Sequence, residues 1–568
     1  MNTFTNSSIF LVLVCTISLS GEALGQTLPL GFPLLQDYLR REQVMGRVPT
    51  SPSFNYSPLW LEELYPEADS PFLTDPPSSL IPNLPVLKDT SNFQSSLLPI
   101  DYRSRVNTGH PYGWGDGMML PARGLQTMVS AGVHIKKGNW SFQFYPQMFY
   151  AQNLSFPEYP EDAPNPFFQR MNRGVNGVDA PVRHGDTPHF RMGWGQSHIR
   201  YNFGSFSAGL STENMWWGPG QFNALLMSDN AQGFPHLTLQ TRKPAKTFMG
   251  DFEGQYFVGR LGGSGFTHFS DNAHSNIFEP KNHDLWRYFT GISVSYSPSF
   301  LEGFSLGISR TFQVYREDMR SNVRAYFPLF APLPKEGEGN IENIELREDQ
   351  NLAGFARWVI PAAKFEFYME YLRNDHALNW RDVVLNPEHS RAYTLGFSKY
   401  LPMPDKNWLG IRGEMTQTQI SINNNVRWRG RPNFGLGLYD NNQVRHGLTN
   451  RGQILGSGLG ISGNLAIMEF SLVKEYRKYE LSLERLARDQ NFFRLAQSDG
   501  VAVLPWVDLG IGVGASERYG RYLLEARAKF IRSFNYHFYN PDLELGNPVP
   551  PSLRQSNLHL DFRMAYIL

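Results

Sequence analysis

Cysteine is nearly missing from this sequence, and so is any excess of charge of one sign. The 568 residues include a single Cys, Cys15, close to the N-terminus. If that end is removed as a signal, the mature chain can form no disulfide and no thiolate metal site, and it has no Cys nucleophile. This pattern fits a bacterial envelope protein better than a small secreted scaffold. Lys+Arg and Asp+Glu number 52 each, so there is no basic field that would predict nucleic acid as a partner.

Long apolar runs are also missing after the N-terminus. No later stretch reaches about 18 apolar residues, so the sequence predicts no transmembrane helix. The apolar run at 9–19 is itself too short to cross a bilayer. Ala23 and Gly25 follow it in an A-x-A-like pattern. We therefore predict a signal peptide at 1–25 with cleavage before Gln26, although the usual Lys or Arg is missing near its start.

A lipoprotein signal is the alternative interpretation of the N-terminus, because Cys15 follows the apolar residues "VLV". Val14 is bulkier than the small residue usual before a lipid-modified Cys. Modification there would also cut the apolar run in half. These features favour a cleaved secretion signal.

Alternation of apolar and polar residues is abundant from about Ala122 onward. In "KFEFYMEY" (364–371) the Phe and Met side chains share one face, and Glu366 and Glu370 share the other. The C-terminal "LHLDFRMAYIL" (558–568) alternates in the same way. Such segments are about ten residues or longer and keep one apolar, aromatic-ended face, as strands facing lipid require. We count roughly 17 segments, and bacterial barrels have an even number of strands. The predicted fold is an all-β transmembrane protein, an antiparallel outer-membrane β-barrel of about 18 strands.

The N-terminal part has a different character and predicts a separate segment. Residues 34–46 and 57–67 read as two short helices, and Pro-rich linkers follow them. The predicted organisation is a signal peptide at 1–25, a small, partly helical periplasmic or plug segment at 26–105, and the barrel at 106–568. Long polar connections at 154–188, 316–350, 422–462 and 536–554 are expected to be outer loops.

The stretch "STENMWWGPGQFNALLMSDNAQGFPHLTL" (211–239) concentrates the candidate functional residues. Counting parity along its first strand places Trp216 on the lipid side, where Trp is enriched at membrane interfaces. The same count places Trp217 and Glu213 on the lumen side. The lumen groups have two interpretations. Paired charges commonly cross-link a barrel wall, whereas aromatic faces with carboxylates and amides also bind sugars.

We take the following residues as candidates for contact with polysaccharide: Trp217, Glu213, Asn214, Asp229, Asn230, His236, Arg242, Asp251, Glu253, Arg445, His446, Asn450 and Gln453. The aromatic residues predicted at the membrane interface are Trp216 and Tyr566.

Catalytic signatures are scarce. There is no G-x-S-x-G elbow, no H-E-x-x-H and no P-loop. A G-x-G-x-x-G match at 458–463 precedes a strand pattern and so lacks the helix that this motif requires. His389 lies near Glu388 and Asp375 in sequence, but a loop whose polar side chains bond its own backbone explains these residues better. We predict no enzyme, no metal and no cofactor.

Several segments taken together resemble the Wzi-type capsule assembly proteins of the bacterial outer membrane. They are "HPYGWGDGMMLPARG" (110–124), "ENMWWGPGQFNALLMSDNAQGFPHLTL" (213–239), "FEFYMEYLRNDHALNWRDVVLNPEHSRAYTLG" (365–396), "VRHGLTNRGQILGSGLG" (444–460) and "KYELSLERLARDQNFF" (478–493). The resemblance implies an 18-stranded barrel closed by loops and a periplasmic helical part. It also implies lectin-like, non-catalytic attachment of exported capsular polysaccharide at the outer membrane.

The resemblance leaves several alternatives open. One is a diffusion or uptake porin, which needs an open lumen, and another is an outer-membrane hydrolase built around His389. A TonB-coupled transporter would need a larger N-terminal plug. We expect a single barrel in contact with outer-membrane lipid. Whether lumen or outer loops hold the polymer is left open.

Overall fold

The computed structural model describes most of the chain from residue 27 onward. The described residues are 27–28, 33–60, 93–159, 163–269, 278, 281–282, 284–321, 323–328, 347–374, 384–385, 387–388, 390–421, 437–540, 542–544, 548 and 553–567. The predicted signal peptide at 1–25 lies outside them.

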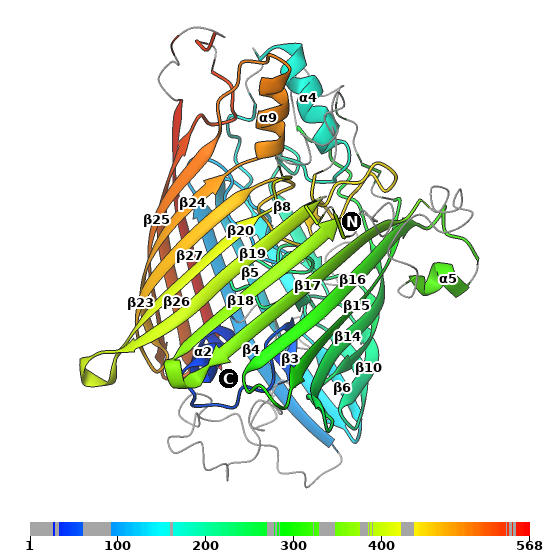
Figure 1. The fold of residues 1–568 in the computed structure, drawn as a ribbon, viewed down its shortest axis with the longest axis vertical. Helices are drawn as coiled ribbons and strands as arrows, with labels where there is room; N and C mark the ends of the chain where they lie inside the picture. Colours follow the sequence, from blue (N-terminus) through cyan, green and yellow to red (C-terminus); the bar gives the residue numbers. More distant parts are fainter. Residues whose placement is uncertain are drawn as a thin grey trace, which may run out of the picture.

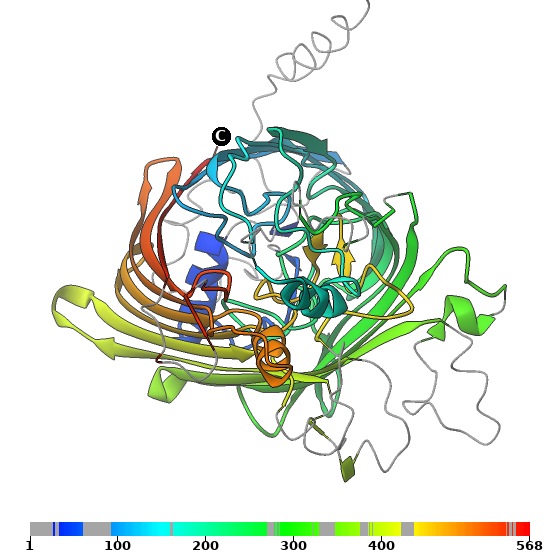
Figure 2. The same ribbon diagram turned by 90° about the horizontal axis from the view of Figure 1, so that it is seen from above.

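The chain closes into an antiparallel barrel (Figure 1, Figure 2). Its segments are β4 (Phe93–Asn107), β5 (Gly124–Lys137), β6 (Trp140–Phe144), β7 (Gln147–Ala151), β8 (His189–Gly193), β9 (His198–Phe203), β10 (Phe206–Ser211), β12 (His236–Thr241), β13 (Ala245–Lys246), β14 (Gly250–Leu261), β15 (Arg287–Pro298), β16 (Phe304–Tyr315), β17 (Asp349–Ile360), β18 (Phe365–Asn374), β19 (Arg391–Pro402), β20 (Trp408–Gln417), β23 (Asn464–Lys474), β24 (Arg477–Ala487), β25 (Val507–Tyr519), β26 (Tyr522–Phe534) and β27 (Arg554–Tyr566). Three strands are interrupted, as β6–β7, β8–β9 and β12–β13, so the described residues build 18 strands. The predicted fold class is confirmed.

The last strand closes the barrel against the first, with Leu560 of β27 opposite Val106 of β4. β4 begins at Phe93 and so lies partly within 26–105, which the sequence analysis placed outside the barrel. The register of β4 against β5 shifts between Leu98 and Asp101. This irregularity interrupts the period-two pattern, which explains why alternation did not reveal the strand.

The strands alternate between lipid and lumen as predicted. In β18, Phe367 and Met369 are 45% and 43% exposed, whereas Glu366, Tyr368 and Glu370 are buried. An apolar outer face and a polar inner face are what a barrel in a bilayer requires. Within the described part of the chain, no helix is both long and apolar enough to cross a membrane.

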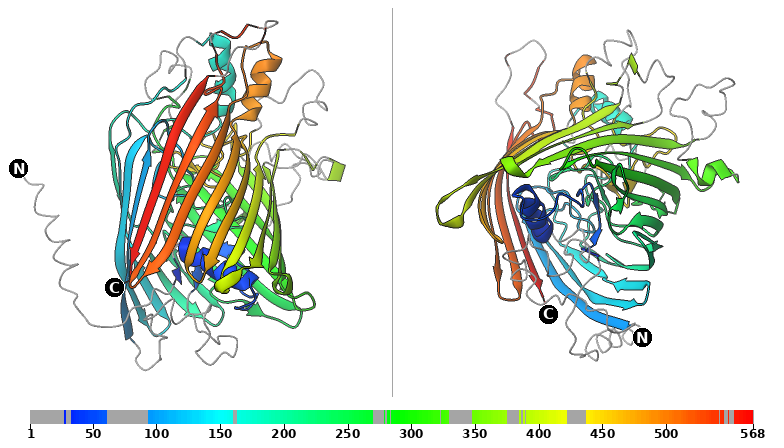
Figure 3. Two further views of the ribbon diagram at one scale, coloured as in Figure 1. Left: turned by 90° about the vertical axis from the view of Figure 1, so that its left-hand side faces the viewer. Right: turned by 60° about the horizontal axis from the view of Figure 1, so that its bottom comes forward.

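The two ends of the barrel differ. Short turns, such as those at 138–139 and 520–521, lie at the end that also holds the C-terminal end of β27 (Figure 3). Long connections lie at the other end and carry the helices α4 (Asn165–Val175) and α9 (Gln490–Ser498) (Figure 1). Short periplasmic turns and long outer loops identify these ends as periplasmic and extracellular. A further short helix, α5 (Val323–Tyr326), lies between β16 and β17, and the 3-10 turns η4 (Pro361–Ala363) and η5 (Pro404–Lys406) connect β17 to β18 and β19 to β20.

Residues 33–60 of the N-terminal segment lie inside the periplasmic end of the barrel (Figure 3). They contain the helix α2 (Pro33–Val44), which confirms the helix predicted at 34–46. The helix predicted at 57–67 is wrong where the chain is described, because β2 (Tyr56–Ser57) and β3 (Leu59–Trp60) are extended. β3 pairs with β1 (Thr27–Leu28).

An apolar core occupies part of the lumen. It joins side chains of the N-terminal segment, of two inward-folded loops at 212–235 and 437–463, and of the barrel wall: Tyr56, Met215, Trp217, Leu225, Leu226, Met227, Ala231, Phe234, Phe257, Leu261, Phe289, Ala353, Leu372, Ala392, Leu438, Tyr439, Leu448, Ile454 and Leu455. Burying this much apolar surface inside the barrel favours a filled interior over a water-filled one.

Candidate functional site

The Trp-Trp-Gly-Pro-Gly stretch folds into the lumen. Its two tryptophans form β11 (Trp216–Trp217), which pairs with β2 so that Trp216 lies opposite Ser57. The Nε1 of Trp217 donates a hydrogen bond of 2.8 Å to Gln255, and its indole packs against Phe257. The loop and the N-terminal segment are therefore one folded unit within the barrel.

Two glycines allow this loop to pass close to the barrel wall. A Cβ on Gly218, whose φ is +119°, would lie 2.2 Å from Oε1 of Glu370. A Cβ on Gly220 would lie 1.9 Å from the carbonyl oxygen of Asn223. The Glu370 carboxylate instead accepts hydrogen bonds from the backbone N–H groups of Gly220 (2.7 Å) and Leu225 (2.9 Å). Only residues without a side chain fit this approach.

A second carboxylate holds the next part of the loop. Glu414 of β20 accepts backbone N–H groups from Gln221 at 2.7 Å, Phe222 at 3.1 Å and Asn223 at 2.9 Å. Wall carboxylates thus satisfy backbone donors that no strand partner reaches.

The inward loop at 437–463 packs against the first loop. It contains a small hairpin of β21 (Thr449–Asn450) and β22 (Gln453–Ile454). The hydroxyl of Tyr439 donates to the carbonyl oxygen of Leu225 at 2.6 Å, and the backbone N–H of Ser228 donates to Leu455 at 2.7 Å.

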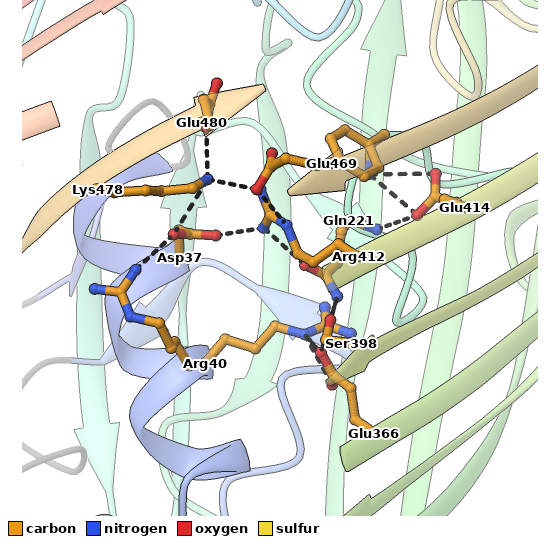
Figure 4. A network of polar contacts seen from close by, with 12 residues as sticks. Asp37, Arg40, Gln221, Glu366, Ser398, Arg412, Glu414, Glu469, Lys478 and Glu480 are labelled. Atoms are coloured by element: carbon orange, nitrogen blue, oxygen red, sulfur yellow. Dashed lines mark hydrogen bonds and ion pairs between the residues drawn. The ribbon is translucent and has the colours of Figure 1, made fainter. Parts of the chain in front are cut away.

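Ion pairs join α2 to the barrel wall (Figure 4). Arg412 contacts Asp37, Glu469 and Gln221, and Lys478 lies 2.9 Å from Glu469. One turn further along the helix, Arg40 contacts Glu366 at 3.2 Å. Burial of Asp37 would raise its pKa, but Lys478 first, then Arg412 and Arg41, outweigh burial and hold that pKa well below its usual range. Asp37 is therefore charged at neutral pH.

A cavity of about 320 Å³ lies between α2, the inward loops and one side of the barrel wall. Its size is at the lower end of the range of small-molecule sites. The lining aromatic residues are Tyr112, Trp114, Trp216 and Phe222. The lining cations are Arg40, Arg103, Arg105, Arg412, Lys478, Arg527 and Lys529, and the lining carboxyl groups belong to Asp37, Asp116, Asp229, Glu469, Glu480, Glu525 and Asp561.

The structure places both tryptophans in the lumen, as predicted for Trp217 but not for Trp216. Trp217 is 1% exposed and belongs to the lumen core, so its surface is not free for a ligand. Trp216 is half-buried and lines the cavity, so its predicted place in the lipid-side girdle is wrong. The reason is that β10 ends at Ser211 and the chain then turns inward, which ends the alternation. Tyr566 lies on β27 at the periplasmic end, 4.9 Å from the ring of Tyr522, and its role at the membrane interface stays a prediction.

Four further candidates lie around the first inward loop. Glu213 is 1% exposed and accepts a 2.5 Å hydrogen bond from Arg200 of the wall. Asn214 donates to the carboxyl group of Asp229 at 2.5 Å. Asn230 donates to the carbonyl oxygen of Ile454 in the other inward loop at 2.9 Å. Of these, Asp229 alone lines the cavity, while the contacts of the others hold the loop in place.

Asp229 has an unusual charge state. Burial is the largest influence and raises its pKa to about 8, with Asp116 adding to the effect and Arg103 and Arg563 opposing it. The group is therefore mostly protonated at neutral pH, and a protonated carboxyl group can both donate and accept a hydrogen bond.

The candidates on β12 to β14 face the N-terminal segment more than the cavity. His236 is buried beside Phe234. Asp251 accepts a hydrogen bond of 3.1 Å from Ser51, and Glu253 accepts one of 2.8 Å from the backbone of Ser53. These two carboxylates are anchors for the N-terminal segment.

Arg242 does not face the lumen as predicted. Its Nε donates to the carbonyl oxygen of Gly204 in a periplasmic turn at 3.0 Å. Gln240 and Thr241 are both buried, so alternation ends with β12, one residue before Arg242.

The candidates at 445–453 form part of the second inward loop. Arg445 is exposed, whereas His446 is buried with its Nδ1 2.7 Å from the hydroxyl of Tyr315. Asn450 and Gln453 are buried and donate to backbone carbonyl oxygens of the first inward loop, at Gln232 and Asn230. Burial is the largest influence on the pKa of His446 and lowers it to about 3.

Sequence reasoning missed most of the cavity. Tyr112, Trp114 and Asp116 lie in the connection between β4 and β5, which also folds inward. Arg103 and Arg105 of β4 contact Asp116 at 3.0 and 2.7 Å. The aromatic–Gly–Asp pattern in "PYGWGD" was a usable signal, because it repeats the aromatic and glycine content of the other inward loop.

No group of three or more metal-ligating side chains is placed to hold a metal ion in the part of the chain that is described. His389 and Asp375, on which the hydrolase alternative depends, lie outside the described residues.

Comparison with known proteins identifies the family. The sequence profile of the capsule assembly protein Wzi matches residues 122–469, more than half of the chain. No curated protein sequence matches. The structure is similar to that of Wzi from Escherichia coli, described as an outer-membrane protein involved in group 1 capsule assembly and a carbohydrate-binding β-barrel. The TM-score is 0.57 at 15% identity, over 95% of this chain and 99% of that one.

Weaker likeness extends to Acinetobacter baumannii OccAB2 (TM-score 0.38, 8% identity, 83% of this chain and 98% of that one) and to Pseudomonas aeruginosa OccK2 (TM-score 0.36, 10% identity, 83% and 98%). At these scores neither protein informs the function of this chain. The profile match decides the assignment: the chain belongs to the Wzi family of capsule assembly proteins, and it is a β-barrel of the bacterial outer membrane.

Proposed function

We propose that the protein binds exported capsular polysaccharide and attaches it to the cell surface, without catalysing a reaction. Family membership supports a role in capsule assembly. The observation that carries the binding role is the lumen cavity, where aromatic rings and densely hydrogen-bonded polar groups meet. Aromatic faces and fixed polar groups together are the chemistry that recognises sugars.

The filled lumen argues against the porin alternative. Two inward loops and the N-terminal segment share an apolar core inside the barrel. A diffusion channel needs a continuous water-filled path. Holding a polymer needs only an accessible site, so the arrangement favours attachment over conduction.

The ion pairs support a non-catalytic role. A general acid or base needs a carboxyl group free to exchange its proton with a substrate. Glu469 of the cavity instead contacts both Arg412 and Lys478, and Glu480 contacts both Lys478 and Arg527. These two carboxylates are therefore engaged in ion pairs within the wall.

The N-terminal segment completes the organisation that we propose. Residues 33–60 close the periplasmic end, and the barrel acts as a single unit whose apolar outer face meets lipid. The ion pairs of α2 with the wall support the first point, and exposed apolar side chains such as Phe367 and Ile511 support the second.

A retention assay tests the proposed function. Cells lacking the protein are complemented with the wild type or with an empty vector, and cell-bound and released polysaccharide are measured separately. We expect the deletion to shed polymer into the medium while total synthesis stays the same. Unchanged retention together with reduced uptake of small solutes would overturn the proposal in favour of a porin.

A further inference from the structure

The two adjacent tryptophans lie in opposite environments. Trp217 is enclosed in the lumen core, whereas Trp216 is half-buried and lines the cavity. Among the described residues, no aromatic ring packs on Trp216 and no cation lies over it. Trp216 is therefore the indole of the pair that keeps accessible surface, and that surface belongs to the lining of a polar cavity.

The other aromatic residues of the cavity already have partners. The guanidinium of Arg412 lies 5.2 Å from the ring centre of Phe222. The ammonium of Lys529 lies 5.8 Å from that of Trp114, and Tyr112 packs 5.4 Å from the same indole. A ligand that covered one of these rings would have to displace its partner and would lose the stabilisation that this contact provides. Trp216 is thus the aromatic face of the cavity that a ligand can cover without displacing a protein contact.

The N-terminal segment holds the backbone that carries this indole. Trp216 pairs with Ser57 across β11 and β2, and the backbone N–H of Gly218 donates to Asn55 at 2.8 Å. A backbone held on both sides limits the movement of Trp216, and a pre-organised surface binds with a smaller entropic cost.

The charges of the cavity are compensated within the protein. Each lining cation contacts a carboxylate: Arg40 with Glu366, Arg103 with Asp116, Arg105 with Asp116 and Asp561, Arg412 with Asp37 and Glu469, Lys478 with Glu469 and Glu480, Arg527 with Glu480 and Glu525, and Lys529 with Glu484. An acidic ligand would meet cations that are already paired, together with carboxylates that repel it, so its charge would gain little net attraction. An uncharged ligand with hydroxyl groups meets no such repulsion.

We infer that Trp216 is the stacking surface of a carbohydrate subsite inside the lumen, and that the unit it takes is an uncharged pyranose of the polymer. The C–H face of a pyranose covers the indole, and its hydroxyl groups reach polar groups of the cavity such as Asp229 and Gln221. This inference rests on the proposed function and places part of the binding in the lumen.

The test follows Trp216 directly. The full-length protein is labelled with 5-fluorotryptophan in detergent, and the fluorine resonance of Trp216 is identified by its loss in Trp216→Phe. The probes are oligosaccharide fragments of the host's own surface polysaccharide, prepared by partial acid hydrolysis and separated into neutral and acidic fractions. We expect the neutral fraction to shift the Trp216 resonance saturably, and the acidic fraction to shift it much less.

Variants separate stacking from folding. We expect Trp216→Ala to weaken binding of the neutral fraction about tenfold or more, and Trp216→Phe to weaken it only a few fold because a ring remains. Trp194→Ala is the control, since Trp194 is 69% exposed and lies outside the cavity. A folded barrel migrates differently on an SDS gel before and after boiling. Each variant should keep this heat-dependent difference in mobility, which shows that its barrel is folded.

The outcomes distinguish the two proposals. If immobilised protein retains the intact polymer but neither fraction shifts Trp216, the lumen subsite is wrong and the proposed function stands. If the acidic fraction alone shifts Trp216, the assignment of an uncharged unit is wrong. If intact polymer is not retained at all, the proposed function itself fails.

Discussion

Glu366 is the carboxylate that ties helix α2 to the barrel wall, and its replacement by Gln tests how the plug is held. The side chain is 1% exposed and accepts hydrogen bonds from Arg40 (3.2 Å), Arg357 (2.8 Å), Gln221 (2.8 Å) and Ser398 (2.9 Å). One of the two cations comes from α2 and the other from the wall. The Arg40–Glu366 pair therefore exists only while the helix is docked, whereas the Arg357–Glu366 pair lies within the wall.

The expected magnitudes differ between the two sides of this contact. Glu366→Gln leaves Arg40 and Arg357 buried without their anion, and breaking a buried pair costs about 3–5 kcal/mol. Arg40→Met leaves Glu366 paired with Arg357 and removes one charge-assisted hydrogen bond, which is worth about 1.5–3 kcal/mol. Undocking of α2 should therefore become easier in both variants, and more so in Glu366→Gln.

Amide hydrogen exchange measures this directly. Exchange through local opening reports the free energy of that opening. We expect residues 33–44 to exchange between about 100-fold and a few thousand-fold faster in Glu366→Gln, and about 10- to 100-fold faster in Arg40→Met, since each 1.4 kcal/mol is a factor of ten. Amides of β26 serve as the internal control and should not change. Equal exchange of 33–44 in Glu366→Gln and the wild type would refute this account of how the helix is anchored.

Further predictions concern the loop, the pH dependence and the lumen. Gly218→Ala should destabilise the folded barrel because its Cβ would meet a carboxylate oxygen at 2.2 Å, whereas Gly262→Ala, with its nearest atom at 4.0 Å, should not; thermal unfolding compares the two. Asp229 has a pKa of about 8 in the folded protein against an ordinary 3.8. Its protonated form therefore contributes to the free energy of unfolding fully below about pH 4, and this contribution is lost as pH rises through about 8. Asp229→Asn should flatten the pH dependence of stability between these values, and an unchanged profile would contradict the assignment. Trp217→Ala should cost about 3–5 kcal/mol of stability, measured by denaturant unfolding, without the selective loss of sugar binding expected for its neighbour. The wild-type barrel should show little steady conductance in planar bilayers, and a large stable conductance would mean that the lumen is open.

Regular strands were predictable because one physical rule governs them. Glu366 and Phe367 are adjacent in sequence, and lipid on one side and a polar lumen on the other impose their opposite exposure. β4 escaped this reasoning because its register shift interrupts the alternation. Parity also failed beyond Ser211, where the chain leaves the wall, and for this reason Trp216 was wrongly predicted to face lipid.

The site was less predictable than the fold. Its residues range from Gln36 to Asp561, and closure of the barrel together with three inward segments brings them together. Composition revealed that the stretch around Trp216 was unusual. It could not reveal that α2, the connection after β4 and the strands β23 to β27 share a cavity with it, because those contacts depend on long-range packing.

The decisive experiment is binding of polymer by the purified protein. Labelled polysaccharide from the host is mixed with liposomes that contain the protein, the liposomes are sedimented, and the chain length of the polymer is measured before and after. We expect polymer to sediment with protein-containing liposomes and not with empty ones, and its chain length to stay the same. Polymer that stays in the supernatant would contradict attachment, and polymer that becomes shorter would contradict a non-catalytic role.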